Sequence, residues 1–223
     1  MNILVIGEHA NYVECREKFG AAHTYHHLTG DVSHKDLDGQ NIVFDFGITH
    51  HADRIELYSG FPEIVYFLNV VTTTLSLIVG SGNMDIICFG FAGLPSFISH
   101  QVLEVSLLKQ SHEGNLSTVC KLLNVECQVV KDSVGMVTPR VICMIINEAY
   151  IAVYEGTASR EDIDIAMKLG TNYPYGPFEW CSRIGTRNVF ALLSAMLRET
   201  GDERYAICPL LREECFHDKT TEE

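Results

Sequence analysis

Two side chains in the first half of the sequence are of a type, and in a place, that could handle a proton. Thr73 lies in the polar stretch NVVTTTL directly after an apolar run, and Glu104 lies in the segment VLEV. Moving a proton from an alcohol needs a general base, most often a histidine, and His100 lies four residues before Glu104. A hydroxyl, an imidazole and a carboxylate are the kinds of side chain that such proton transfer uses.

The same residues also have ordinary structural interpretations. A threonine triplet after a strand is commonly a turn and a helix cap, and a lone glutamate in a strand can simply point to solvent. His50 and His51 follow the segment NIVFDFGIT. They lie at the carboxyl end of a predicted strand, where α/β proteins place binding sites, but loop histidines are often only solvated.

The segment after the first apolar run bears on nucleotide binding. A dinucleotide loop needs the pattern G-x-G-x-x-G, because its glycines allow a tight turn and bring the pyrophosphate close to a helix N-terminus. Here the segment reads GEHANY, and only Gly7 of the three glycines is present. Glu8 adds a negative charge, and Tyr12 adds bulk. The acidic residue expected to hold the ribose is absent from HTYHHL. We therefore predict that ordinary NAD binding is lost.

Cysteine and histidine usage predicts neither disulfides nor a metal site. The eight cysteines form no CxxC pair and mostly lie in apolar stretches, so we expect buried, reduced thiols. The adjacent pairs His26-His27 and His50-His51 are poor metal ligands, because neighbouring residues seldom reach one ion. No cysteine or carboxylate is spaced to complete such a site.

Composition excludes several classes of protein. A formal net charge of -13 argues against a nucleic-acid partner, which would need clustered lysines and arginines. The uncharged run 64–79 is shorter than the ~20 residues of a membrane span and is interrupted by Asn69 and several threonines. The N-terminus MNILVIG has no basic flank or cleavage site of a secretory signal. We expect a cytoplasmic protein without a membrane segment.

The apolar pattern predicts two kinds of structure in succession. Short apolar runs indicate strands at residues 1–7, 21–28, 41–46, 63–70, 84–91 and 124–130, with a strand or short helix at 101–109 and a helix at 8–19. This alternation is typical of an α/β domain with a mainly parallel sheet. After Ser133 helical periodicity dominates. We place one domain at residues 1–131, a helical domain at 132–215 and a flexible tail at 216–223.

Capping signals divide the second half into helices. Thr138-Pro139 can begin a helix that ends near Glu155, where Gly156 can take a left-handed conformation. Ser159 can cap a second helix that ends near Gly170. A third helix is predicted over 177–184 and a fourth over 187–200. The polar, acidic segment after Leu211 is expected to fray.

The order of residues in this second half resembles the C-terminal helical domain of the 3-hydroxyacyl-CoA dehydrogenase family. The resemblance spans about residues 130–211 and includes the following positions: Asp132, Gly135, Arg140, Asn147, Glu148, Ala149, Gly156, Ala158, Asp162, Ile163, Asp164, Ala166, Met167, Gly170, and Pro174 to Pro177. It implies a homodimer formed through the helical domain, and a site for an acyl-CoA ester. The whole chain would then be a shortened Rossmann-like domain followed by an all-helical dimerisation domain.

The same resemblance is degenerate in the first half. It places Thr73 at the family's hydroxyl position, Glu104 at the glutamate that orients the catalytic histidine, and Phe89 where that histidine belongs. Ala92 stands at the position of an asparagine, and Pro139 replaces another. The distance from the first strand to NIVFDF is about half of what the family requires, so a strand or a helix pair is predicted to be missing.

Three hypotheses follow from these observations. The chain is a degenerate dimeric member that binds acyl-CoA or acts as an accessory protein. Alternatively, it is an active NAD-dependent 3-hydroxyacyl-CoA dehydrogenase in which His50, His51 or His100 serves as the base. As a third possibility, it works only when paired with a full-length homologue. Under the first hypothesis no cofactor is expected, and under the second the cofactor is NAD.

Overall fold

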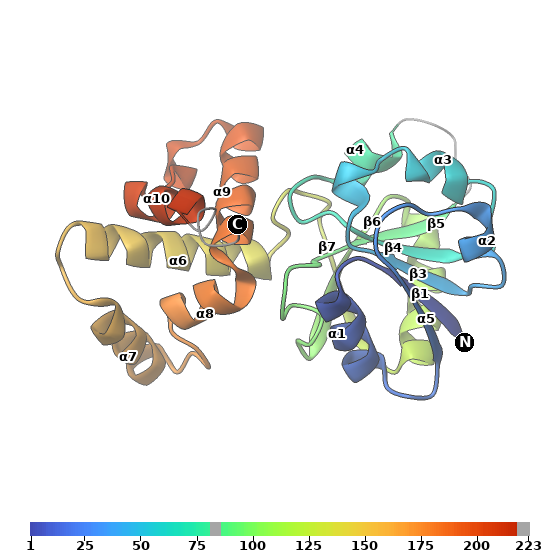
Figure 1. Cartoon of the computed structure of the whole chain (residues 1–223), viewed down its shortest axis with the longest axis horizontal. Coiled ribbons are helices and arrows are strands. Elements are labelled where there is room, and N and C mark those ends of the chain that lie inside the picture. Colours follow the sequence, from blue (N-terminus) through green and yellow to red (C-terminus); the bar gives the residue numbers. More distant parts are fainter. Residues whose placement is uncertain (81–85, 218–223) are drawn as a thin grey trace. The chain divides into compact units, whose positions relative to one another are not determined.

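The computed structural model describes residues 1–80 and 86–217 (Figure 1). The chain divides into two compact units, Met1–Met136 and Val137–Glu223. Residues 132–136, which the sequence analysis assigns to the helical domain, lie in the first unit. Within the described part of the chain, no helix combines the length and apolar character needed to cross a bilayer.

The first unit is built on a seven-stranded sheet of order β2-β1-β3-β4-β5-β6-β7. The strands are β1 (Asn2–Ile6), β2 (Thr24–Leu28), β3 (Ile42–Asp45), β4 (Val65–Asn69), β5 (Ile87–Phe91), β6 (Val102–Leu107) and β7 (Glu126–Val130). Neighbours are parallel except β5 and β6, which are antiparallel. The predicted strands are confirmed, and segment 101–109 is a strand. Residues 84 and 85 of the predicted fifth strand lie outside the described residues.

The strand order is that of a shortened doubly wound sheet. A complete dinucleotide fold has the order 3-2-1-4-5-6, with a third strand outside β2. Here no described strand pairs with the outer edge of β2, and the chain passes from β2 to β3 through the short helix α2 (His34–Leu37). The missing strand explains the short spacing seen in the sequence.

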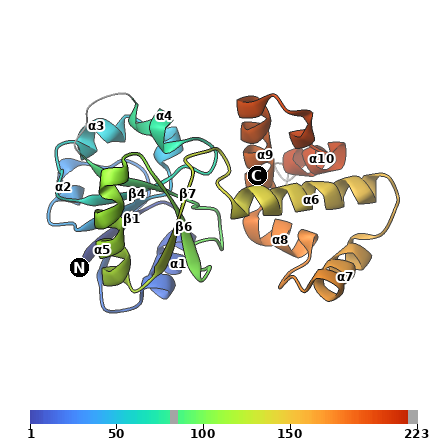
Figure 2. The same ribbon diagram turned by 180° about the vertical axis from the view of Figure 1, so that it is seen from behind.

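Helices cover both faces of the sheet. Helices α1 (His9–Phe19) and α5 (Glu113–Leu123) pack on one face, and their Phe19 and Leu116 join a core with Phe44 and Phe89. Helices α2, α3 (Arg54–Tyr58) and α4 (Leu75–Val79) pack on the other face (Figure 2). Short 3-10 turns lie at Ile48–His50 and Gln110–His112. Helix α5 is absent from the predicted elements, although its buried residues recur at helical spacing.

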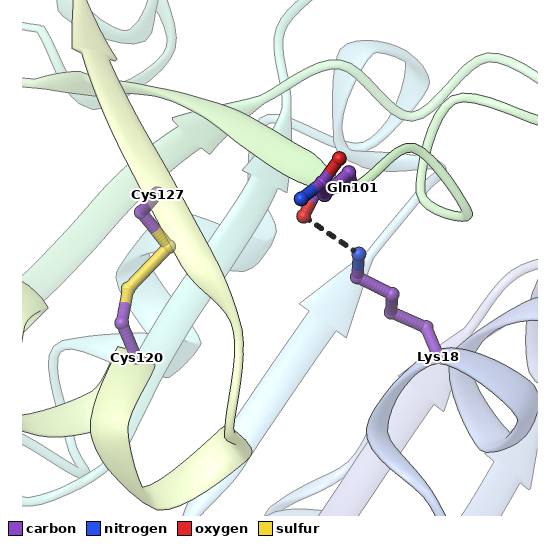
Figure 3. The surroundings of a disulfide bond; sticks show 4 residues. All are labelled: Lys18, Gln101, Cys120 and Cys127. Atoms are coloured by element: carbon purple, nitrogen blue, oxygen red, sulfur yellow. Dashed lines mark hydrogen bonds between the residues drawn. A yellow bond between two sulfur atoms is a disulfide. The ribbon is translucent and has the colours of Figure 1, made fainter.

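Two cysteines of this unit form a disulfide, which contradicts the prediction of reduced thiols throughout. Cys120 lies in the last turn of α5 and Cys127 lies in β7 (Figure 3). Asn124, in the left-handed conformation, ends α5 and turns the chain back into β7. This tight turn places the two sulfurs together. The other six cysteines are free and buried, as expected.

The second unit contains five helices and one 3-10 turn in its described part. They are α6 (Thr138–Tyr154), α7 (Arg160–Thr171), α8 (Pro177–Ile184), α9 (Thr186–Thr200), a turn at Glu203–Tyr205 and α10 (Pro209–His217). Helix α6 packs against α8, α9 and α10. The four predicted helices are confirmed, but α7 ends at a left-handed Asn172 rather than at Gly170.

Helix α10 corrects the prediction that the chain frays after Leu211. Leu211 and Cys215 are buried, and the rings of Phe190 and Phe216 are 5.5 Å apart. Tyr150 donates a hydrogen bond to Glu214 (2.7 Å), and Arg160 pairs with the same carboxylate. Apolar burial and a shared carboxylate therefore hold the acidic segment as a helix. Residues 218–223 of the predicted tail lie outside the described residues.

Candidate functional site

The carboxyl ends of β1, β3, β4 and β5 meet at one edge of the sheet, which is where open α/β sheets bind ligands. Gly7 follows β1, and Thr73 lies in the loop after β4. Glu104 reaches the same edge from β6, because β6 runs antiparallel to β5. The fold thus assigns all three predicted residues to one edge, on strands that are not immediate neighbours.

Gly7 is needed for a close approach between α1 and β3. A Cβ at this position would lie 2.8 Å from Asn11 Oδ1 and 2.9 Å from Phe46 Cβ. The Asn11 side chain also accepts a hydrogen bond from the Glu8 backbone N–H (2.9 Å). An amide of the protein itself therefore occupies part of the turn in which a dinucleotide loop would hold its ligand. The retained glycine has a structural explanation that does not involve a cofactor.

Aromatic side chains fill the positions of the two missing glycines. The Tyr12 ring stacks on His27 with centroids 5.1 Å apart, and the His9 ring lies 5.7 Å from the same histidine. His27 Nε2 donates to the Gly7 carbonyl (2.9 Å). The second glycine of the pattern lets the backbone approach the pyrophosphate, and the third lets helix and strand pack closely. The residues present do not fit a bound NAD molecule.

The Thr73 loop serves as the entry to α4. Thr73 N–H donates to Val70 O (3.1 Å), and Thr74 Oγ1 caps the helix by accepting from Leu77 N–H (3.2 Å). Thr73 itself is half-buried. Thr74 therefore caps α4, and the predicted site residue Thr73 lies beside it.

Asp132 occupies the N-terminus of α4. Its two carboxylate oxygens accept from the backbone N–H groups of Leu75 (2.8 Å) and Ser76 (2.9 Å). Ser106 Oγ donates to the same carboxylate (3.3 Å). A helix N-terminus at a strand end is a position suited to an anion, and here an internal carboxylate takes it. Asp132 is one of the residues that carry the family resemblance, but the sequence alone does not predict that it caps α4.

A second polar side chain closes the sheet edge between β3 and β5. Asn69, the last residue of β4, donates to Phe46 O (3.3 Å) and accepts from Gly93 N–H (3.0 Å). A Cβ at Gly93 would lie 2.7 Å from the Asn69 side chain. Asn69 therefore joins the ends of three strands. Sequence reasoning notes it only as a polar interruption of an apolar run.

The buried pair Asp45 and Arg54 stabilises the end of β3. Arg54 Nη1 donates to both carboxylate oxygens (3.1 Å each), and Tyr58 O–H donates to Asp45 Oδ2 (2.7 Å). Arg54 Nη2 also donates to Gly30 O in the loop after β2. Every charge in this network has a partner, as burial requires. The sequence does not predict this ion pair, because Asp45 and Arg54 are nine residues apart and belong to no recognisable motif.

The β5–β6 register shows which residues of β5 lie beside Glu104. Phe89 pairs with Leu107 inside the sheet and is fully buried in the core. Phe91 pairs with Val105, so the next residue, Ala92, is level with Glu104. Ala92 is 4% exposed and cannot accept a proton. Phe89 therefore lies in the core, and the side chain level with Glu104 on β5 is not a base.

His100 is the candidate base whose electrostatics involve Glu104. Burial lowers the pKa of His100, the charge of Glu104 raises it, and Lys18 lowers it, with a net shift below the ordinary value. Lys18 on α1 donates to Gln101 O (3.2 Å) and to His100 O, which fixes the loop before β6 (Figure 3). His50 ends a 3-10 turn after β3 and is exposed, and His51 is half-buried. Within residues 1–80 and 86–217, no three His, Cys, Asp or Glu side chains are arranged to hold a metal ion.

The motif residues of the helical unit have visible structural roles. Asp164 on α7 accepts from the backbone N–H groups of Phe178 (2.9 Å) and Glu179 (3.2 Å) at the start of α8. Asn147 on α6 holds the segment before α10 by donating to Ala206 O (2.9 Å) and accepting from Cys208 N–H (3.0 Å). These contacts explain why an Asp and an Asn are needed at those positions, without reference to catalysis.

Large apolar side chains remain exposed on the same unit. Leu169 and Ile165 on α7 are 84% and 52% exposed. They are four residues apart and therefore lie on one face of the helix. A small apolar pocket is lined by residues of α6, α7, α8 and the turn before α8, namely Ile142, Ile145, Ile146, Met167, Tyr173, Tyr175, Pro177 and Trp180.

Comparisons with known proteins agree with this division of the chain. Residues 135–222 match the model of the 3-hydroxyacyl-CoA dehydrogenase C-terminal domain. The chain is 46% identical to 3-hydroxyadipyl-CoA dehydrogenase of Escherichia coli over 84 residues, which are 38% of this chain and 18% of that protein. It is 25% identical to 3-hydroxybutyryl-CoA dehydrogenase of Clostridioides difficile over 193 residues, or 83% of this chain and 69% of the relative. The resemblance found in the sequence is thereby confirmed.

The whole fold is shared with solved dehydrogenases. The structure of (S)-3-hydroxybutyryl-CoA dehydrogenase from Ralstonia eutropha matches with a TM-score of 0.76 and 20% identity, covering 97% of this chain and 94% of that one. At this identity the match concerns the fold alone. In the match to the Escherichia coli protein, the chain spans 18% of the length of that protein.

Proposed function

Given that this chain is a 3-hydroxyacyl-CoA dehydrogenase family protein, we propose that it is a dimeric member that binds an acyl-CoA ester without oxidising it. One observation carries the proposal. The family is NAD-dependent, and the position of the dinucleotide loop is filled by the stack of Tyr12 on His27, with Asn11 closed over Gly7. Without a place for the pyrophosphate, hydride has no acceptor.

The surroundings of Glu104 support the same proposal. Oxidation of a 3-hydroxyl group requires a base that takes the proton while hydride leaves. The residue level with Glu104 on β5 is Ala92, and the nearby α4 N-terminus is held by the Asp132 carboxylate. Ala92 has no group that accepts a proton, and the Asp132 carboxylate is already engaged by two backbone N–H groups. Thr73 lacks the basicity to replace that base.

The proposal of a homodimer rests on the helical unit. Leu169 and Ile165 together form an exposed apolar patch on one face of α7, and such patches are typical of interaction surfaces. A second copy of α7 would bury both residues. The acyl-CoA ligand is proposed from the names of the relatives, which act on 3-hydroxyadipyl-CoA and 3-hydroxybutyryl-CoA.

Calorimetric titration with acetoacetyl-CoA, together with absorbance at 340 nm in the presence of NADH, tests this function. The proposal expects binding of the CoA ester and no loss of NADH absorbance. Oxidation of NADH would overturn it. Failure to bind the ester would remove the ligand from the proposal and leave a chain that dimerises or completes a partner.

A second candidate function is an active dehydrogenase with a replaced base. One observation favours it: the charge of Glu104 acts on His100, as an orienting carboxylate acts on a catalytic histidine. If NADH oxidation is found, His100→Ala should abolish it, whereas His50→Ala should not. Equal loss in both variants, or in neither, would reject His100 as the base.

A further inference from the structure

The Cys120–Cys127 disulfide links an edge strand to the helix that covers it. Among the described strands, β7 pairs with β6 alone, so it has one neighbour instead of two. The disulfide joins it to the last turn of α5 across a Cα–Cα distance of 6.6 Å (Figure 3). The bond therefore holds a strand that the sheet supports on one side only.

Cys127 differs from the other cysteines in its access to solvent. The six free cysteines are all buried, and burial raises the pKa of the thiols of Cys15, Cys88 and Cys143. A raised pKa keeps a thiol protonated and therefore unreactive. Cys127 is half-buried on the edge strand, whereas Cys120 is 7% exposed. A dissolved reagent thus meets Cys127 first.

We propose that Cys127 and Cys120 form a thiol–disulfide exchange site for a small disulfide such as oxidised glutathione. Cys127 is the residue that reacts first, and Cys120 is the one that resolves the mixed disulfide. The helix supports this order, because Cys120 lies near the carbonyl end of α5, where negative charge on a thiolate is disfavoured.

The exchange balances in two steps. The Cys127 thiolate attacks one sulfur of oxidised glutathione, the S–S bond of glutathione breaks, and one glutathione leaves as a thiolate that takes up a proton. The Cys120 thiolate then attacks the Cys127 sulfur and releases the second glutathione. Two cysteine thiols are oxidised, and one glutathione disulfide is reduced to two thiols. Excess reduced glutathione runs the same steps backwards.

The state of the pair controls how firmly the end of β7 is held. The chain continues from Val130 to Asp132, whose carboxylate binds the N-terminus of α4 and accepts from Ser106. Reduction removes the covalent link between α5 and β7 and leaves that strand with its β6 pairing and its noncovalent packing against the core. We therefore expect reduction to loosen β7, Asp132 and the first turn of α4 together.

Equilibration of the protein in glutathione buffers of different redox ratio tests the exchange. After quenching, unfolding and labelling with N-ethylmaleimide, intact mass should show six labels in oxidising buffer and eight in reducing buffer. The melting temperature should fall by about 5 °C on reduction. Eight labels at every ratio, or six at every ratio, would overturn the proposal.

Single and double variants test the roles of the two sulfurs. In Cys120→Ser the remaining Cys127 should form a stable mixed disulfide with glutathione, whereas Cys120 in Cys127→Ser should react at least tenfold more slowly. The reverse order would overturn the assignment of Cys127 as the first to react. The double variant should melt at one temperature in both buffers, and a redox-dependent shift there would assign the effect to other cysteines.

Discussion

Asp164 caps α8 from a different helix, and Gly176 is the residue that permits it. The Asp164 carboxylate accepts from Phe178 N–H and Glu179 N–H, and a Cβ on Gly176 would overlap that carboxylate. The spacing between Asp164 and the Tyr-Pro-Tyr-Gly-Pro turn in the sequence therefore reflects one contact, the capping of α8 by Asp164. It connects α7 to α8.

Gly176→Ala should destabilise the protein by about 2 kcal/mol, because the new methyl group displaces the capping carboxylate. Urea denaturation of the variant measures this loss. Gly170→Ala is the matched control, since a Cβ at that helical position meets nothing within 4 Å. The control should gain up to about 1 kcal/mol from better helix propensity. Equal stability of the two variants would contradict the capping role of Asp164.

Asp132→Ala should release the N-terminus of α4. Loss of two charge-assisted hydrogen bonds to Leu75 N–H and Ser76 N–H is expected to cost about 1–2 kcal/mol. Hydrogen exchange should become faster at these two amides. Asp31→Ala removes an exposed carboxylate of the same unit and should leave the exchange unchanged. Unaltered exchange in Asp132→Ala would show that the carboxylate does not hold the helix.

Glu14→Gln should raise the melting temperature at pH 7. Burial and the charge of Glu17 raise the pKa of Glu14 above 4.5, despite an opposing hydrogen bond from Ser96 N–H (2.6 Å). Just above pH 4.5 the folded protein therefore binds more protons than the unfolded chain. The free energy of unfolding then falls as the pH rises through the folded pKa of Glu14. The gain should shrink toward pH 4, where the carboxyl is mostly protonated in both states.

The exposed carboxylate of Glu213 provides a control for that experiment. Glu213→Gln changes the net charge equally and should have the same melting temperature as the parent at both pH values. A gain for Glu14→Gln that persists undiminished at pH 4 would mean that burial of the charge is not its cause.

Leu169→Glu should convert the proposed dimer into a monomer, because it places a charge on the exposed face of α7. Light scattering after size-exclusion chromatography measures the mass. Leu77→Glu is the control: this leucine is 68% exposed on α4 of the sheet unit. A parent protein that is already monomeric, or a dimer that survives the Leu169 change, would reject α7 as the interface.

The sequence predicts the elements well where the pattern is local. The run NIVFDF became β3, and the turn before Pro177 marks the start of α8. Helix α5 was not predicted, because Gly114, Asn115 and Ser117 are poor helix formers that interrupt the apolar pattern of Leu116 and Val119. Helix α10 escaped because its stability comes from Glu214 meeting Tyr150 and Arg160, which are distant in sequence.

The candidate site was predictable as a list of residues but not as an arrangement. Gly7 was identified from the glycine pattern, and Thr73 and Glu104 from the family resemblance. The fold assigns all three to one edge of the sheet. Asp132 reaches Leu75 over 57 residues of sequence, and no local pattern reveals such a contact. The level position of Ala92 beside Glu104 depends on the β5–β6 register, which the sequence alone does not give.

We propose that the Tyr12–His27 stack leaves no place for a dinucleotide. Direct titration with NADH tests this proposal. Isothermal calorimetry of the oxidised protein at low salt should show no binding at concentrations up to the millimolar range. Saturable binding with a micromolar dissociation constant, abolished in a variant that alters the GEHANY loop, would contradict this proposal. It would favour the alternative that the chain is an active dehydrogenase.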